Sequence, residues 1–244
     1  MNSFTKKIVF LLLIITIPCL LFAQSQSQGQ ARAGEPIAEN IGVDSAQQKL
    51  KEISVTKFED PAYFRTAMSR DQGYASTRRL IGSPLEKKPL EDEKQLGIEE
   101  EDKYVLGLKV HYDRRGVNSF AVLPVRPLPI PGITKTISVW VVGRNTNNVL
   151  SILLYDYSNN PKELVMGKLN FSGWKKLTVA IPSEISQRDF HYPNANGLKF
   201  GGFRVDCDIV DTYGVYYIYF DDLRAVSDLF SEESRDLDDM TDGW

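Results

Sequence analysis

The residues with the clearest capacity for chemistry are two adjacent carboxylates, Asp221 and Asp222, which follow an aromatic run that begins at Tyr213. A glycosidase needs two carboxyl groups flanking one bond, one as acid and one as nucleophile or base. Neighbouring residues of a β-strand point to opposite faces of the sheet, so this pair cannot meet at one glycosidic bond. The pair is therefore predicted to be structural rather than catalytic.

Other catalytic signals are missing from the sequence. Two histidines, His111 and His191, stand alone, and no cluster of Cys and His has the spacing of zinc or haem ligands. The sequence contains no G-x-S-x-G motif, no phosphate-binding glycine loop and no dinucleotide fingerprint. We therefore expect no enzymatic activity, no catalytic residue and no bound cofactor.

One metal site fits the pattern of carboxylates. Glu59 follows the first predicted core strand, and Asp222, with Asp221 as the alternative, lies on the last, so the carboxylates become neighbours if these strands pair. Hard oxygen ligands suit Ca²⁺, which makes Glu59 and Asp222 candidate ligands of a structural calcium ion. The alternative is that both are ordinary carboxylates at the rim of the sheet, bound to backbone amides or to arginine.

The run from Tyr213 to Val226 carries the strongest strand signal in the chain, because β-branched and aromatic residues dominate it. Both of its faces are apolar up to the two aspartates, which is typical of a strand in the centre of a sheet or between two layers. We expect this strand to close a β-sandwich, with Asp221 and Asp222 at its rim.

Further strands are predicted at short intervals, and no long helical pattern follows Tyr104. They span Ile53–Phe58, Tyr104–Tyr112, Asn118–Val125, Thr136–Val142, Val149–Tyr157, Leu164–Phe171, Lys175–Ile181 and Leu198–Asp206. This spacing predicts an all-β fold, an antiparallel β-sandwich of the jelly-roll type. Trp140 and Trp174 are expected between its two sheets, where large rings contribute heavily to a core.

Residues 1–23 have the pattern of a secretory signal peptide, with two lysines before an apolar run and the small Ala23 at the cleavage position. The apolar run is shorter than the roughly 20 residues of a membrane-spanning helix, and Pro18 interrupts it. A lipoprotein would use Cys19, whose neighbours suit lipidation poorly. Cleavage leaves only Cys207, so we expect no internal disulfide and a buried thiol that packs as a small hydrophobic group.

Three segments are predicted after the leader. Residues 24–52 are polar and read as a disordered or weakly helical linker, with a short helix around Ser45–Ile53. Residues 53–230 form the sandwich. Residues 231–244 form an acidic tail.

Charge and exposed side chains bear on possible partners. The net charge of −3 becomes −5 when the leader and its two lysines are removed, which argues against nucleic acid and anionic membranes as partners.

The charged stretch Leu85–Asp102 is interpreted as a solvated loop, with a partner-docking loop as the alternative. Trp244 is a candidate anchor on a neighbouring subunit, with an unimportant exposed ring as the alternative. Six arginines are candidates for contacts with acidic patches of a neighbour: Arg65, Arg70, Arg78, Arg79, Arg114 and Arg115.

Several motifs resemble known families. Phe58-Glu59-Asp60, Gly173–Leu177 and Tyr219–Leu223 are similar to motifs of carbohydrate-binding-module jelly rolls, a galactose-binding-like fold. The order of longer stretches resembles the spirochaete flagellar filament outer-layer (sheath) proteins, the FlaA family. These stretches are Phe58–Asp60, Ser138–Arg144, Gly167–Trp174, Ile181–Gln187 and Tyr217–Arg224 with the following Ser227–Phe230.

The FlaA resemblance implies a structural role. Members of this family coat the flagellin core of the periplasmic flagellum, influence filament stiffness, curvature and motility, and are exported by the general secretory route. The implied partners are flagellin core subunits, other sheath proteins and further copies of the same chain, with no membrane anchor after cleavage. A secreted or periplasmic glycan-binding module is the alternative function, for which the loop tyrosines Tyr63, Tyr74, Tyr112 and Tyr192 are candidates.

Overall fold

The computed structural model describes residues 35–41, 48–96, 102–188 and 197–230. The predicted signal peptide, most of the predicted linker, the acidic tail and Trp244 lie outside the described residues. Everything that follows concerns the unit that begins at Pro36. No helix within the described ranges is long and apolar enough to cross a membrane.

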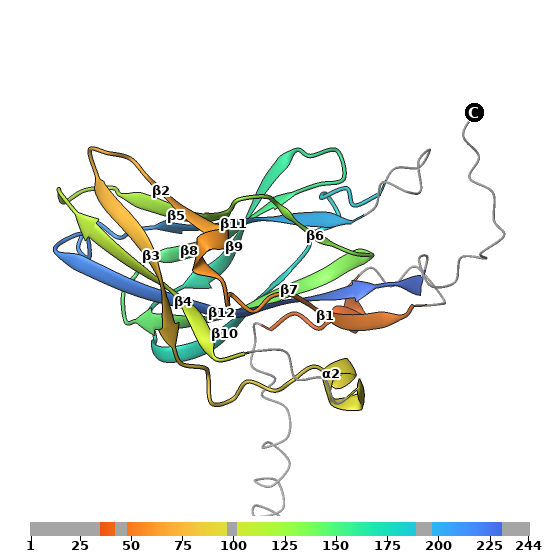
Figure 1. Cartoon of the computed structure of the whole chain (residues 1–244). Helices are drawn as coiled ribbons and strands as arrows, with labels where there is room; N and C mark the ends of the chain where they lie inside the picture. The colour runs from red at the N-terminus through yellow and green to blue at the C-terminus, as the bar shows by residue number, and fades with distance from the viewer. Residues whose placement is uncertain (1–34, 42–47, 97–101, 189–196, 231–244) are drawn as a thin grey trace, which may run out of the picture. The chain divides into compact units, whose positions relative to one another are not determined.

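Two antiparallel sheets face each other as the layers of a sandwich (Figure 1). The first sheet has the order β10 (Ser172–Ala180), β7 (Ile133–Arg144), β12 (Val215–Asp228), β4 (Tyr104–Tyr112) and β3 (Gly73–Ile81), and β1 (Leu50–Thr56) also pairs with β12. The second has the order β2 (Phe64–Met68), β5 (Ser119–Pro124), β11 (Leu198–Asp206), β8 (Val149–Tyr155) and β9 (Pro161–Lys168), and β6 (Leu128–Ile130) also pairs with β11. Three short helices complete these residues: η1 (Ala38–Asn40), η2 (Pro61–Tyr63) and α2 (Glu91–Leu96). The prediction of an all-β antiparallel sandwich is confirmed.

The core between the sheets is built around phenylalanine rings. Phe203 of β11 and Phe220 of β12 stack across the sandwich with ring centroids 4.8 Å apart, and both are almost fully buried. Phe58 packs beside them from the segment after β1, with its backbone at a φ of 61°. That left-handed conformation costs a bulky residue roughly 1–2 kcal/mol, which burial of the ring offsets.

The two tryptophans lie elsewhere than predicted. In β7 the buried core positions are Ile137, Val139 and Val141, and Trp140 alternates with them. In β10, Trp174 and the buried Leu177 are three residues apart, so they point to opposite faces of the sheet. Both indoles are therefore half-buried on the outer face of the first sheet, because the alternation of a strand assigns each position to one face.

β12 lies at the centre of the first sheet and changes partner along its length. One edge pairs with β4 over Val215–Phe220 and then with β1 over Leu223–Asp228, while the other edge pairs with β7 from Phe220 onward. The first and last strands of the sandwich therefore pair, which was the condition for bringing Glu59 near Asp222. The register on β7 shifts between Asp221 and Arg224, which is a β-bulge at the point where the partner changes.

Some elements differ from the sequence-based expectation. The short helix predicted around Ser45–Ile53 is wrong from Leu50 onward, because these residues belong to β1. Strands β2 and β3 were not predicted, since their polar and exposed positions hide the alternation. The stretch expected to be a solvated loop contains α2.

We predict that Phe220→Ala lowers the free energy of unfolding by about 3–5 kcal/mol, because it removes a stacked ring and leaves a cavity in the core. Tyr217→Ala, on the opposite face of the same strand, serves as the matched control and should cost about 1 kcal/mol or less. Urea unfolding followed by tryptophan fluorescence measures both values. Equal losses for the two variants would contradict this assignment of faces.

Candidate functional site

The Asp221–Asp222 pair is buried in the middle of β12, so the prediction that it lies at the rim is wrong. Asp221 is 0% and Asp222 1% exposed. The core-facing residues on either side are Phe220 and Leu223, with two residues between them instead of one. The bulge therefore turns both carboxylates away from the core, which also corrects the expectation that they point to opposite faces. Asp222 has a φ of 49°, a left-handed conformation that aspartate tolerates better than most residues.

Asp221 is held by a lysine from the connection between β3 and β4. The Lys87 Nζ lies 2.9 Å from one Asp221 carboxylate oxygen and 2.5 Å from Asp102 Oδ1, and the Lys87 side chain is 6% exposed. Burial raises the pKa of Asp221 to about 7, although the ammonium of Lys87 lowers it. A single cation thus serves two carboxylates, one of them without contact with solvent.

Asp222 is held by Arg224, two residues further along the same strand. The guanidinium Nε lies 2.8 Å from Asp222 Oδ2, and the other nitrogens reach Glu52 at 3.4 Å and the backbone oxygen of Lys88. Burial alone would lower the pKa of Arg224, but the Asp222 carboxylate beside it raises the pKa above its ordinary value. Because breaking a buried ion pair leaves an unpaired charge, this contact is far more consequential than an exposed pair.

We call residues 82–96 the strap, because these ion pairs fasten them to the outer face of the first sheet. Besides Lys87 and Lys88, the strap contributes Asp92, 2.8 Å from Lys51, and Glu93, 2.5 Å from Lys57. Burial alone would raise the pKa of Glu93, but the ammonium of Lys57 beside it brings this pKa below its ordinary value. Figure 1 shows α2 on the side of the first sheet that faces away from the second sheet. The charged stretch is therefore a docked segment over the described part of its length.

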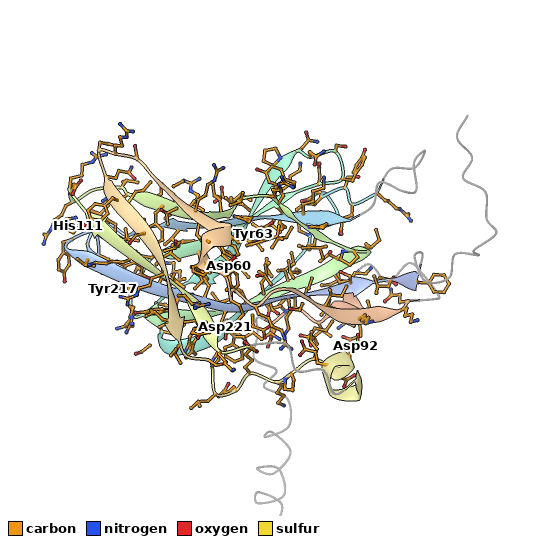
Figure 2. All side chains as sticks on the ribbon, viewed as in Figure 1. Asp60, Tyr63, Asp92, His111, Tyr217 and Asp221 are labelled. Atoms are coloured by element: carbon orange, nitrogen blue, oxygen red, sulfur yellow. The ribbon has the colours of Figure 1, made fainter. Side chains whose placement is uncertain are left out.

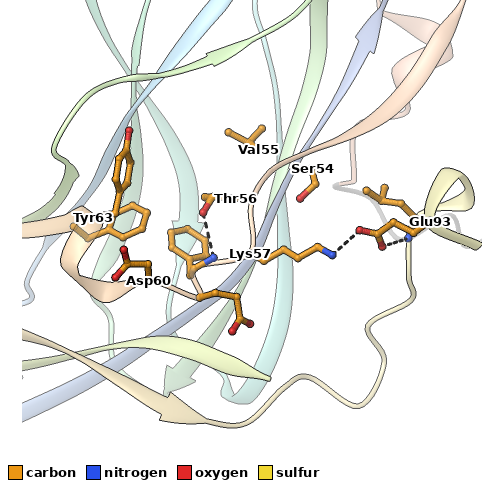
Figure 3. A pocket seen from close by; sticks show the side chains of 11 residues that line it. Ser54, Val55, Thr56, Lys57, Asp60, Tyr63 and Glu93 are labelled. Atoms are coloured by element: carbon orange, nitrogen blue, oxygen red, sulfur yellow. Dashed lines mark hydrogen bonds and ion pairs between the residues drawn. The ribbon is translucent and has the colours of Figure 1, made fainter. Parts of the chain in front are cut away.

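A hollow of about 730 Å³ lies between the end of β1 and the strap (Figure 3). Thr56, Lys57, Asp60, Tyr63 and Glu93 are among the residues that line it. Two of its polar side chains have partners within the chain: Asp60 caps η2 by accepting from the Ala62 amide, and the Tyr63 hydroxyl donates to the Arg126 carbonyl. The lining offers no nucleophile paired with a base, so it suggests no covalent chemistry.

The two candidate calcium ligands have separate partners. Glu59 Oε1 accepts hydrogen bonds from the amides of Lys103 and Tyr104 at the start of β4, whereas Asp222 binds Arg224. Within the described ranges, no group of three or more Asp, Glu, His or Cys side chains could hold a metal ion. The calcium site stays a prediction.

The six candidate arginines lie on β2 and β3, in the turn between these strands, and in the β4–β5 connection. Arg65 lies on β2, Arg70 in the β2–β3 turn, and Arg78 and Arg79 on β3, all of them exposed. Arg114 and Arg115 lie between β4 and β5, where Arg114 binds Asp71 at 2.6 Å and Arg115 lies over the Tyr213 ring. Arg79 covers the Tyr104 ring at 4.1 Å. Their role in partner contacts stays a prediction.

The four tyrosines proposed for a sugar platform do not form a cluster that the structure describes. Tyr112 is buried against Cys207, with its hydroxyl oxygen 3.2 Å from the sulfur, and Tyr192 lies outside the described residues. Tyr63 faces the hollow beside η2, whereas Tyr74 stacks on His111. Cys207 is a buried free thiol whose pKa burial raises to about 11, as expected for a packing residue.

Sequence reasoning missed an exposed surface on the outer face of the first sheet, away from the strap. Tyr217 is 42% and Tyr74 57% exposed. The run that contains Tyr217 was interpreted as apolar on both faces, which is typical of a strand in the centre of a sheet or between two layers. Figure 2 shows Tyr217 and Asp221 on the same strand, Tyr217 toward its beginning and Asp221 toward its middle. Strict alternation of tyrosine with Ile218 and Phe220 was the available signal, because only one set can face the core.

Beside Tyr219 this surface contains a hollow of about 420 Å³. Tyr219 and Trp174 supply aromatic walls, and Arg144 lies 5.4 Å above the Tyr219 ring centre. The remaining lining is largely apolar: Leu80, Ile81, Gly82, Val105, Val142 and Gly173. An exposed apolar hollow with a cation at its edge is typical of a contact site for another molecule.

Comparison with known proteins gives consistent sequence matches. The family profile described as "Flagellar filament outer layer protein Flaa" matches residues 28–236. A putative flagellar filament outer layer-like protein of Brachyspira hyodysenteriae is 39% identical over 221 residues, which cover 89% of this chain and 99% of that protein. A flagellar filament outer layer protein of Spirochaeta aurantia is 30% identical over 172 residues, covering 55% of this chain and 51% of the relative.

Among solved structures, carbohydrate-binding modules match at low similarity. The module TmCBM61, solved with β-1,4-galactotriose, has 11% identity and a TM-score of 0.38, covering 68% of this chain and 88% of the module. The solution structure of CtCBM11 has 12% identity and a TM-score of 0.41, and the match covers 75% of this chain and 98% of that module. Likeness at this level says nothing about what this chain binds.

We predict that Arg224→Met lowers the free energy of unfolding by about 3–5 kcal/mol, because it leaves the Asp222 carboxylate buried without its cation. Arg78→Met, a change of the same chemistry at an exposed position of β3, should cost less than about 0.5 kcal/mol. Chemical denaturation of both variants gives the comparison. A loss for Arg224→Met no larger than that of its control would show that the buried pair is unimportant.

A second prediction concerns pH. Asp221 binds its proton more tightly in the folded protein than in the unfolded chain, where its pKa is about 3.9. Its contribution to stability is therefore full below about pH 4 and is lost as the pH rises to about 7. Relative to Asp221→Asn, the wild-type protein should lose stability across this window, as measured by urea unfolding at a series of pH values. Parallel profiles would refute the raised pKa.

Proposed function

The chain belongs to the flagellar filament outer layer protein family, and we propose on that basis that it is a structural subunit of the sheath around a periplasmic flagellar filament. The observation that carries the proposal is the 39% identity to a relative that the match covers over 99% of its length. The predicted signal peptide agrees with a periplasmic location reached by the general secretory route.

The fold suits a protein that acts as a surface. A sandwich with a phenylalanine core and strapped outer face is a stiff unit, with two broad faces and two loop ends for contacts with the flagellin core and with lateral neighbours. A layer of such units enlarges the filament radius, and bending stiffness rises steeply with radius. We propose that the subunit affects filament stiffness, curvature and motility in this way, without catalysis.

Contacts between subunits are proposed to be electrostatic and individually weak. Arg65, Arg70 and Arg78 are exposed on β2, in the β2–β3 turn and on β3, and the 231–244 segment is acidic in sequence. Exposed ion pairs contribute little one at a time, but repetition along a filament adds them through multivalency. A glycan-binding role has less support, because the three suggested tyrosines that the structure describes, Tyr63, Tyr74 and Tyr112, do not form one platform.

We predict that mass spectrometry of isolated periplasmic flagella finds this protein, and that immunogold labelling places it along the filament. Washing from about 0.1 M to 1 M salt should release it before the flagellin core dissolves, because the screening length falls from about 10 Å to 3 Å. Sedimentation of the intact core at each step is the control. Absence from isolated filaments would refute the proposed function, and retention at 1 M salt would refute electrostatic attachment.

A further inference from the structure

The exposed part of the first sheet's outer face combines cations with aromatic rings. Three cross-strand rows follow from the register: Tyr74–His111–Val215, Ser76–Lys109–Tyr217 and Arg78–Gly107–Tyr219. None of these positions carries a carboxylate, and Asp113, 3.3 Å from His111, is the acid beside the first row. With Arg144 over Tyr219, the face presents Arg78, Lys109 and Arg144 around a tyrosine stripe. We call this surface the basic aromatic face.

The missing side chain of Gly107 lets the Tyr219 ring approach the backbone of β4 closely. A Cβ atom at Gly107 would stand 3.1 Å from the ring and 2.9 Å from a Leu80 methyl group. The ring therefore covers the backbone and forms a wall of the 420 Å³ hollow. Ile81, 86% exposed, lies at the same hollow. An occupant suited to the face carries acidic groups for the three cations and apolar groups for the hollow.

The 231–244 segment of the chain has this composition. Its sequence, SEESRDLDDMTDGW, holds six acidic residues against one arginine, and Leu237, Met240 and Trp244 are interspersed with them. Charge complementarity favours its encounter with Arg78, Lys109 and Arg144. Tryptophan is also among the side chains enriched at the energetically dominant positions of interfaces.

The placement of the two parts favours a neighbouring copy over the same chain. The segment follows the end of β12, beyond Asp228, whereas the basic aromatic face lies along the first half of that strand. Between them the strap crosses the same outer side, fastened by Lys87 to Asp221 and by Lys88 to Arg224. The point at which the segment leaves the described chain and the basic aromatic face thus lie toward opposite ends of β12, and a contact of this kind between copies repeats as an open head-to-tail series.

We propose that the basic aromatic face binds the acidic 231–244 segment of a neighbouring copy of this chain. The neighbour is the next subunit of the sheath, so in this respect the inference rests on the proposed function. The contact itself is a property of the purified protein and is tested without filaments.

The test uses charge reversal in the full chain and sedimentation velocity at low and high salt. The wild-type protein should associate in a concentration-dependent, salt-sensitive manner. A face variant, Lys109→Glu with Arg144→Glu, and a segment variant, Asp238→Lys with Asp239→Lys, should each associate at least about tenfold more weakly. An equimolar mixture of the two variants should associate again, because each then meets a partner of opposite charge.

Matched controls separate this contact from general charge effects. The control variant Arg126→Glu with Lys168→Glu changes the net charge by the same amount as the face variant. Its two positions lie on the second sheet and its connections, so it should leave association unchanged. A labelled synthetic 231–244 peptide should bind the wild-type protein and bind the face variant at least about tenfold more weakly, whereas a scrambled peptide of the same charge should bind the wild-type protein less tightly.

Three results would overturn the proposal. The first is that both variants associate as strongly as the wild-type protein, and the second is that the equimolar mixture of variants does not associate. The third is that the peptide binds a chain ending at Phe230 but not the full chain, because the face would then be filled by the segment of the same chain. If the protein coats filaments but the variants behave as wild type, the contact is refuted and the proposed function stands. If the variants behave as expected but isolated filaments lack the protein, the proposed function is refuted and the contact stands.

Discussion

Two carboxylates buried side by side in a central strand constrain the rest of the structure. Asp221 and Asp222 have no contact with solvent to speak of, so each needs a cation within hydrogen-bonding distance. Arg224 is supplied by the strand itself, across the bulge, while Lys87 comes from the connection between β3 and β4. The burial of Asp221 therefore requires the strap to be docked, and the docked strap in turn buries Asp221.

The bulge at Asp222 links this charge cluster to the sheet. It marks the point where the edge of β12 changes partner from β4 to β1, and the extra residue keeps Phe220 and Leu223 both in the core. In a regular strand without a bulge, positions 220 and 223 would face opposite sides of the sheet, and one of these two apolar side chains would point away from the core. The same feature accordingly serves the strand pairing, the phenylalanine core and the attachment of the strap.

Attachment of the strap divides the outer face of the first sheet into two parts. Around Asp221, Asp222 and Arg224 the face is covered and its charges are paired within the chain. Along the first half of β12 it stays open, and there Lys109 and Arg144 lie among tyrosine rings with no acidic residue in the three rows. We propose that this protein of the filament outer layer family acts through contacts with its own copies and with partners. The open part of the face is the surface whose charged and aromatic side chains are available for such contacts.

Much of the fold follows from local patterns in the sequence. The alternation of apolar residues placed β4 and β11 at their observed bounds, and the aromatic content of the Tyr213–Val226 run identified the central strand. The order of motifs also pointed to the family. These features depend on neighbouring residues along the chain, and the period of a strand is enough to read them.

Tertiary structure decided which face of each strand is covered, and this is where the predictions failed. Trp140 and Trp174 have the size of core residues, yet they lie on the outer face because the phenylalanines of β11 and β12 fill the space between the sheets. Asp221 and Asp222 look like rim residues in the sequence, yet a bulge and a lysine 134 positions away bury them. Burial of a charge depends on a partner brought by the fold, and no local pattern records the distance to that partner.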